Sequence, residues 1–133
     1  MSEGKVLVID DDKNVRTLIK MALLRGGYEV VEAENGVKGM QLLLMNDNPS
    51  TVGLIVCDIH MPDVNGTEAI TYFQSHYPSL PVIIMTGQPD YCHEAQMFRR
   101  GVVDYLVKPI QSHILVAAVR RAVSQRAPKK SVA

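Results

Sequence analysis

Residues 6–12 read Val-Leu-Val-Ile-Asp-Asp-Asp, an apolar, β-branched run that ends in three carboxylates. The continuous apolar run Val6–Ile9 favours a strand that is covered on both faces. An apolar stripe with the spacing of one helix face follows, made of Val15, Leu18, Ile19, Ala22 and Leu23. Asp12 is placed to cap the start of this helix, and Gly26-Gly27 ends it. The stretch therefore predicts a strand and a helix joined by an acidic loop.

The same pattern of a strand followed by a helix recurs four more times along the chain. Further strands are expected at Tyr28–Glu32, Leu54–Cys57, Val82–Met85 and Val102–Val107. Further helices are expected at about Gly36–Met45, at Thr67–His76, between Pro89 and Arg100, and from Gln111 to about Gln125. This alternation predicts an α/β fold, an open, doubly wound (βα)₅ domain with a five-stranded parallel sheet. We expect the flavodoxin-like strand order 2-1-3-4-5.

The length and charge of the chain limit its organisation and its partners. Its 133 residues suit one domain, which we place at 1–126, with a short basic tail or linker start at 127–133. Fourteen basic residues balance fourteen acidic ones, although residues 1–64 carry a charge of −4 and residues 65–133 carry +4. A balanced charge argues against direct binding to nucleic acid or to a membrane surface. We expect a cytoplasmic protein.

Charged and polar residues follow four of the five predicted strands. Asp10, Asp11 and Asp12 follow the first strand and Asp58 follows the third, while Thr86 and Lys108 follow the fourth and fifth. The carboxyl ends of parallel strands meet at one edge, where ligands bind at the point of strand reversal. Carboxylates suit Mg²⁺ that shares its coordination with a phosphate, and a lysine suits the same phosphate. The pattern predicts a metal-assisted phosphoryl site on a carboxylate, without choosing which aspartate is the acceptor.

Four motifs together resemble the receiver domain of two-component response regulators. They are Val-Leu-Val-Ile-Asp10-Asp11-Asp12, Asp58-Ile-His-Met61-Pro62-Asp-Val-Asn-Gly66, Met85-Thr86-Gly87 and Asp104-Tyr105-Leu-Val-Lys108-Pro109. They occur in the family's order, and the resemblance extends over residues from about 5 to 125. The spacing from Asp58 to Gly66 together with the final Lys-Pro makes the resemblance specific.

The resemblance implies a role for each residue of the site. Asp58 accepts a phosphoryl group from a histidine kinase or a phosphotransfer protein. Asp11, Asp58 and the backbone carbonyl of His60 bind Mg²⁺ (or Mn²⁺), and Asp10 assists through a water molecule. Thr86 and Lys108 bind the phosphoryl group.

The resemblance also implies a switch. Thr86 couples the phosphoryl group to Tyr105, whose ring turns inward. The face formed by the fourth predicted helix, the fifth strand and the last helix then changes its affinity for a downstream effector protein or domain. His60 and Gln88 tune the access of water to the phosphate, and the Lys108–Pro109 peptide bond is cis. The resemblance leaves open a homodimer that forms on phosphorylation, and it implies no enzyme beyond self-phosphotransfer and autodephosphorylation.

Three other functions remain as alternatives. A receiver used only for docking, without phosphorylation, usually lacks one of the acids, the threonine or the lysine, whereas this chain has them all. A Mg²⁺-dependent phosphohydrolase with an aspartyl-phosphate intermediate, as in haloacid-dehalogenase-like enzymes, carries a second Asp where this chain has His60. A flavodoxin-like cofactor binder needs a loop rich in Gly, Ser or Thr after its first strand, and here this loop is acidic.

Overall fold

Strands and helices alternate along the chain in the computed structural model, which describes residues 4–45, 51–60 and 66–126. The strands are β1 (Lys5–Ile9), β2 (Val30–Ala33), β3 (Val52–Asp58), β4 (Val82–Thr86) and β5 (Asp104–Val107). The helices are α1 (Lys13–Arg25), α2 (Gly36–Leu44), α4 (Gly66–His76), α5 (Tyr91–Arg99) and α6 (Ser112–Arg126). The fourth helix and the last helix expected from the sequence are therefore α5 and α6. The predicted tail at 127–133 lies outside the described residues.

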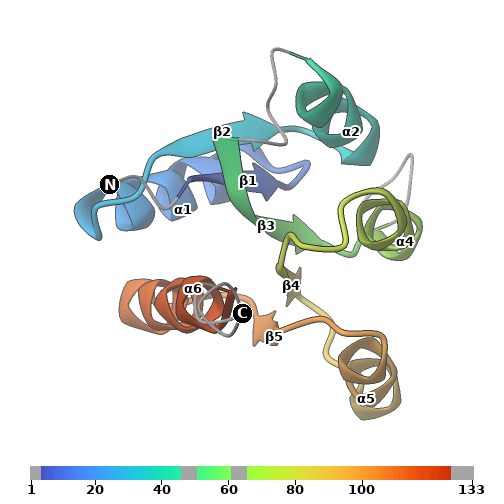
Figure 1. Ribbon diagram of the computed structural model, residues 1–133. Helices are drawn as coiled ribbons and strands as arrows, with labels where there is room; N and C mark the ends of the chain where they lie inside the picture. The colour runs from blue at the N-terminus through green and yellow to red at the C-terminus, as the bar shows by residue number, and fades with distance from the viewer. Residues whose placement is uncertain (1–3, 46–50, 61–65, 127–133) are drawn as a thin grey trace.

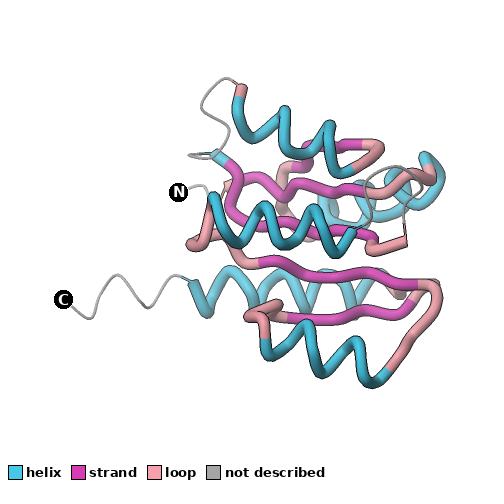
Figure 2. The backbone as a smooth tube through the Cα atoms, turned by 90° about the vertical axis from the view of Figure 1, so that its right-hand side faces the viewer, coloured by secondary structure: helices cyan, strands magenta, loops and turns pink. Residues whose placement is uncertain are grey.

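The five strands form one parallel sheet in the order β2-β1-β3-β4-β5, which confirms the predicted fold class and strand order. Figure 1 shows α1 and α6 on one face of the sheet and α2, α4 and α5 on the other. In Figure 2 the strands lie side by side, with α2, α4 and α5 in front of them. Every residue of β3 and β4 is buried, as their continuous apolar runs predict.

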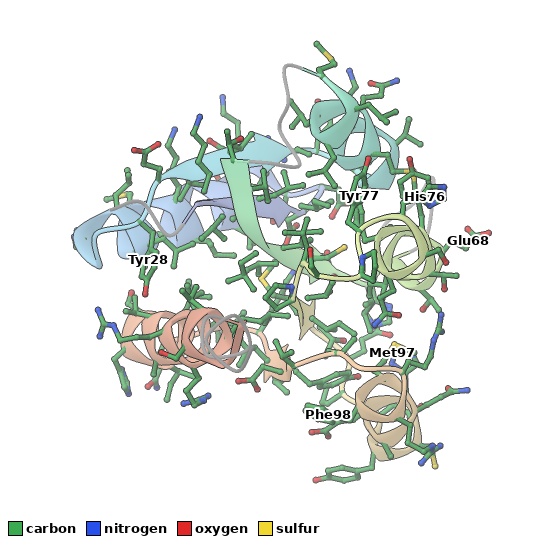
Figure 3. All side chains as sticks on the ribbon, in the orientation of Figure 1. Tyr28, Glu68, His76, Tyr77, Met97 and Phe98 are labelled. Carbon is green, nitrogen blue, oxygen red and sulfur yellow. The ribbon has the colours of Figure 1, made fainter. Side chains whose placement is uncertain are left out.

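A separate apolar core fills the space on each side of the sheet. Ala69, Ile70 and Phe73 of α4 are fully buried in the first core, at the spacing of one helix face. The second core lies between the sheet, α1 and α6, and Tyr28 points into it from the end of α1 (Figure 3). Both faces of the central strands are thus covered, and the open edge at the carboxyl ends of the strands is left for the site.

Two predicted strands begin later in the structure than in the sequence pattern. The amide of Tyr28 donates to the carbonyl of Leu23 at 2.9 Å, so Tyr28 closes the turn after α1 instead of starting β2. In the same way, the amide of Val102 donates to the carbonyl of Met97 at 3.1 Å and ends α5. Apolar residues that close a helix look like strand residues in the sequence, and this similarity explains both differences in bounds. β3, by contrast, is longer than predicted at both ends.

The predicted inward position of Leu18 on α1 is wrong. Ile19, Ala22 and Leu23 are buried, but the side chain of Leu18 is 68% exposed. At 3.6 residues per turn, Leu18 lies at the edge of the apolar stripe, about a quarter of a turn from the middle of the buried set. The apolar pattern of the sequence predicts the helix and the side that faces the core, but it does not predict how many residues at the edge of that side are buried.

Truncating Leu18 and Leu23 tests this difference on one helix. We expect Leu23→Ala to lower the free energy of unfolding by about 2–5 kcal/mol, because it leaves a cavity in a fully buried site. We expect Leu18→Ala to change it by less than about 0.5 kcal/mol. Urea unfolding of both variants measures the two values. Equal losses would contradict the exposed position of Leu18.

The last helix, α6, packs through one face only. Leu115, Ala118, Val119 and Ala122 are buried, whereas Ile114 is 45% exposed, although residues 114–119 are all apolar. The apolar run therefore serves both the core and the surface beside β5. Within the described ranges, no helix combines the length and the apolar character needed to cross a membrane.

Candidate functional site

Three carboxylates meet at the carboxyl edge of the sheet. Asp10 directly follows β1, and Asp58 is the last residue of the neighbouring strand β3. Carboxylate oxygens of Asp10, Asp11 and Asp58 lie within 4.8 Å of one another. Asp10 and Asp58 are buried, at 0% and 2% exposure, while Asp11 is exposed. The site is therefore an acidic cluster with two buried members and one member open to solvent.

Asp10 is held on several sides. Its amide donates to the carbonyl of Ala33 at 3.1 Å, and its Oδ1 accepts a hydrogen bond from the amide of Asp12 at 2.9 Å. Its Oδ2 lies 2.7 Å from Nζ of Lys108 as an ion pair. Among the described residues this buried oxygen has no partner with the angles of a hydrogen bond. Burial raises the pKa of Asp10, and the Lys108 ammonium offsets this only in part.

Lys108 bridges two of the acids from the loop after β5. Its Nζ lies 2.7 Å from Asp10 Oδ2 and 3.1 Å from Asp58 Oδ2. Its amide donates to the carbonyl of Thr86 at 2.7 Å, and its peptide bond to Pro109 is cis. Burial lowers the pKa of the ammonium, but the two carboxylates outweigh burial and raise the pKa above its ordinary value. Lys108 therefore stays charged at neutral pH.

Asp58 presents one oxygen to a backbone donor and the other to a cation. Its Oδ1 accepts a hydrogen bond from the amide of His60 at 3.0 Å, and its Oδ2 faces Lys108. The side chain of His60 is exposed at the rim of the site. The motif residues Met61 and Pro62 lie outside the described residues. Asp58 is thus fixed in orientation beside an ammonium, which suits a carboxylate that takes part in a reaction.

Thr86 ends β4, which pairs with the strand that carries Asp58, and Gln88 follows two residues later. Thr86 is fully buried, and its Oγ1 accepts a hydrogen bond from the amide of Gln88 at 3.0 Å. A hydroxyl that accepts a hydrogen bond can still donate its own proton to another group. Thr86 can therefore keep its contact with the backbone and also bind a ligand oxygen. The side chain of Gln88 is exposed.

Tyr105 is buried against the start of α5. Its hydroxyl lies 3.4 Å from Nδ1 of His93, and the two rings meet edge to face with centroids 6.1 Å apart. Burial raises the pKa of the Tyr105 hydroxyl, so it is protonated at neutral pH. Tyr105 therefore links β5 to α5.

The donor set fits a hard divalent cation. Three carboxylates are gathered in one place, and one of them, Asp11, is exposed. Oxygen-only ligands of this kind suit Mg²⁺ or Mn²⁺, which keep several water ligands. Asp10, Asp11 and Asp58 are the residues that would hold such an ion.

Mg²⁺ should stabilise the fold through these residues. At ten times its dissociation constant, a ligand that binds only the folded state adds about 1.4 kcal/mol to the free energy of unfolding. We expect Asp11→Asn to remove most of this gain, because it removes an exposed carboxylate of the cluster. Asp12→Asn is the matched control, since Asp12 caps α1 and Asn caps a helix equally well. Urea unfolding with and without Mg²⁺ measures the gain, and an equal loss in both variants would contradict the assignment.

Three residues around the site are not singled out by sequence reasoning. Arg16 and Glu32 form an ion pair beside Asp10, and His93 contacts Tyr105. Arg16 follows Asp12 by one helical turn, a spacing that could have placed it near the acids. The pairing of Glu32 with Arg16 and the contact of His93 with Tyr105 depend on how α1 and α5 pack, and no local pattern predicts this packing.

The fold and the site define a class of protein, namely a flavodoxin-like α/β domain with an acidic pocket at the carboxyl edge of its sheet. The family model described as "Response regulator receiver domain" matches residues 6–120. The chain belongs to this family, the receiver domains of two-component systems. Receiver domains bind Mg²⁺ at an acidic pocket, and they are generally regulatory and not enzymatic.

Two curated relatives and two solved structures show the same likeness. The DNA-binding transcriptional regulator NtrC of Escherichia coli K12 is 34% identical over 124 residues, which cover 93% of this chain and 26% of the regulator. The response regulator FleR of Pseudomonas aeruginosa is 30% identical over 118 residues, covering 89% of this chain and 24% of FleR. The chain therefore spans about a quarter of the length of these relatives.

The solved structures are receiver domains by themselves. The apo receiver domain of nitrogen regulatory protein C is 34% identical with a TM-score of 0.81, covering 94% of this chain and 98% of that one. A receiver domain from Clostridium thermocellum is 28% identical with a TM-score of 0.86, covering 95% of this chain and 98% of that one. The likeness thus extends over nearly the whole of a receiver domain.

Proposed function

We propose that this chain is a phospho-accepting switch in which Asp58 takes a phosphoryl group from the phosphohistidine of a histidine kinase or phosphotransfer protein. The observation that carries the proposal is the Lys108 ammonium, which lies 3.1 Å from Asp58 Oδ2 inside the acidic cluster. A carboxylate can act as the nucleophile that forms an acyl phosphate, and a neighbouring ammonium stabilises the charge on the phosphoryl group that is transferred. The complete set of acids, threonine and lysine disfavours a receiver used only for docking.

The transfer forms a bond between an Asp58 oxygen and phosphorus while the bond between phosphorus and the donor imidazole nitrogen breaks. The amide of His60 orients Asp58 through Oδ1. Lys108 is close enough to Asp58 Oδ2 to contact the oxygens of the arriving phosphoryl group. Bound Mg²⁺ supplies further positive charge to balance the carboxylates and the phosphoryl oxygens. Asp10 keeps Lys108 in place through its ion pair.

The switch begins at Thr86 and ends at the α5–β5–α6 face. Phosphorylation adds charge and strong acceptors beside the buried Thr86 hydroxyl. Thr86 lies in β4 next to β5, where Val107 is its register partner and Tyr105 lies two residues before Val107. Tyr105 in turn contacts His93 of α5. A shift of Thr86 toward the phosphoryl group therefore changes the packing under α5.

This face offers an apolar surface to a downstream effector. A groove of about 400 Å³ is lined by Tyr105, Leu106, Val107, Pro109, Ile110, Gln111 and Ile114. Val107 and Ile114 are 48% and 45% exposed and line this groove together, and adjoining exposed apolar side chains are typical of an interaction site. We infer that an effector protein or domain binds here, and a homodimer formed on phosphorylation would use the same surface. His60 and Gln88 would set the phosphate lifetime by limiting the access of water.

The remaining parts of the proposal concern organisation. Residues 1–126 would be the receiver unit and residues 127–133 the start of a basic tail or linker. A cytoplasmic site of action follows from a kinase donor. A phosphohydrolase is the less favoured alternative, because haloacid-dehalogenase-like enzymes carry a second aspartate as their general acid at the position where this chain has His60.

Binding of beryllofluoride, a stable mimic of the phosphoryl group, tests the proposal without a kinase. We expect a bound fluorine resonance in ¹⁹F NMR that requires Mg²⁺ and disappears in Asp58→Asn. The amides of Thr86 and Lys108 should shift at the same time. No bound signal in the wild-type protein with Mg²⁺ would favour the docking-only receiver.

A further inference from the structure

Arg16 of α1 connects the acidic loop to the edge strand β2. Its Nη1 donates to the backbone carbonyl of Asp10 at 2.7 Å, and its Nε donates to Glu32 Oε1 at 3.1 Å. The side chain is only 13% exposed, although it is charged. One guanidinium thus holds the loop after β1 and a residue of β2, next to the proposed metal site.

The carbonyl contact distinguishes Arg16 from an ordinary ion pair. Lys20, one helical turn further along α1, also pairs with Glu32 at a distance of 3.4 Å. Lys20 is 44% exposed, and its pair with Glu32 needs no contact with the acidic loop. Glu32 therefore has two cationic partners, and Arg16 is the one that reaches Asp10. The planar fork of a guanidinium suits two acceptors at once, whereas an ammonium is a single point of charge.

The position of the Asp10 carbonyl matters for two of the proposed metal ligands. This carbonyl belongs to the planar peptide unit that joins Asp10 to Asp11. A hydrogen bond to the Asp10 carbonyl therefore restrains the whole peptide plane, including the amide nitrogen of Asp11. The orientation of this plane sets the direction of the Asp11 backbone. Asp11 is exposed, so burial does not hold its side chain.

Two other hydrogen bonds of Asp10 hold the backbone on either side of the Asp10–Asp11 peptide. Its amide donates to Ala33, and its Oδ1 accepts from the amide of Asp12. Arg16 adds a contact to the carbonyl of this peptide itself. The backbone of the acidic loop is thus held before, at and after the Asp10–Asp11 peptide.

We propose that Arg16 is a positioning residue for the metal site, which it serves by fixing the peptide between Asp10 and Asp11 while Glu32 holds its guanidinium. This inference rests on the proposed Mg²⁺ site. Groups that orient metal ligands from outside the coordination shell typically change metal affinity by about 10–100-fold when removed. Because Arg16 acts on the backbone of the ligands, we expect the lower end, about tenfold.

The test compares Arg16→Met with the matched control Lys20→Met. Both variants remove a cation from Glu32 on the same helix, but only Arg16→Met removes the contact with Asp10. We expect Mg²⁺ to bind Arg16→Met about tenfold more weakly, and Lys20→Met within twofold of the wild type, when amide shifts are followed by NMR. Arg16→Lys is the second variant. It keeps the positive charge, which supports folding, but its ammonium lacks the planar donor pair of a guanidinium, so it should also bind Mg²⁺ more weakly.

A measurement without metal separates this inference from the proposed function. The amide of Asp12 is bonded to Asp10 Oδ1, so it reports on the loop directly. We expect its hydrogen exchange to be faster in Arg16→Met than in Lys20→Met, with no Mg²⁺ present. Urea unfolding shows whether global stability differs between the variants.

The two measurements together decide whether Arg16 positions the metal ligands or only stabilises the loop. Unchanged exchange and unchanged Mg²⁺ affinity in Arg16→Met would overturn the positioning role, as would equal losses in Lys20→Met or full affinity in Arg16→Lys. If the wild type binds no Mg²⁺, the proposed metal site is wrong and the metal-positioning role fails with it. Exchange that still differs between the two Met variants in that case would show a purely structural clamp on the loop.

Discussion

Lys108→Met should slow phosphorylation by about 100- to 1,000-fold, the cost typical of removing one preorganised donor from a developing charge. Nζ of Lys108 lies within 3.1 Å of both Asp10 and Asp58, so its loss leaves the acceptor without its cationic neighbour. The side chain also helps to line an apolar groove of about 380 Å³ with Val15, Leu18, Ile19, Pro109 and Ile110. Methionine can keep these apolar contacts and removes only the ammonium.

The rate of adduct formation with acetyl phosphate at saturating Mg²⁺ measures this effect. Saturating Mg²⁺ limits the repulsion between the two carboxylates that remain, and circular dichroism verifies that the variant is folded. Lys38→Met is the control, because Lys38 is an exposed lysine near the start of α2. A Lys108→Met protein that accepts phosphate at the wild-type rate would remove Lys108 from the proposed mechanism.

Thr86→Ala should leave phosphorylation intact and uncouple it from α5. The hydroxyl of Thr86 is the buried group that lies between the acids and β5, and the proposed switch depends on its hydrogen bond to the phosphoryl group. A ligand shifts an equilibrium only by the difference in how two states receive it. Removing that difference should abolish a coupling that is commonly worth about 5- to 150-fold.

Hydrogen exchange in residues 91–99 and 104–107 reports the coupling without a partner protein. In the wild type, beryllofluoride should change exchange in these segments, and in Thr86→Ala the change should vanish although the mimic still binds. Thr86→Ser, which keeps the hydroxyl, should restore it. Thr17→Ala is a control for loss of a threonine, since Thr17 is exposed and bonds to Lys13 in its own helix. An unchanged response in Thr86→Ala would contradict the coupling role.

The fold follows from the sequence because local and long-range signals agree in it. The apolar run Val6–Ile9 is continuous, and the structure buries it on both faces. The sequence predicts Asp12 as the cap of the first helix, and Asp12 accepts hydrogen bonds from the amides of Asn14 and Val15. The order of the strands places Asp10 and Asp58 side by side, so the pattern of strand ends is enough to predict the acidic cluster.

The features that the sequence does not predict depend on how helices and strands pack against one another. Leu18 fits the apolar stripe, yet neither the sheet nor α6 covers it. Tyr28 closes a turn through its backbone, which its side chain does not reveal. In the sequence, Arg16 resembles any other charged helix residue. Its contacts with Asp10 and Glu32 depend on how α1 packs against the sheet. The choice of Asp58 as acceptor also comes from resemblance, because the chemistry of three clustered aspartates does not rank them.

The intact mass after incubation with acetyl phosphate tests the central claim most directly. The wild-type protein, Asp58→Asn and Asp11→Asn should be compared with Mg²⁺ and with the metal removed. The account predicts one phosphoryl adduct on the wild-type protein, which is lost without Mg²⁺, absent in Asp58→Asn and strongly reduced in Asp11→Asn. An adduct of the same yield in Asp58→Asn, or no adduct in a wild-type protein that also fails to bind beryllofluoride, would contradict it.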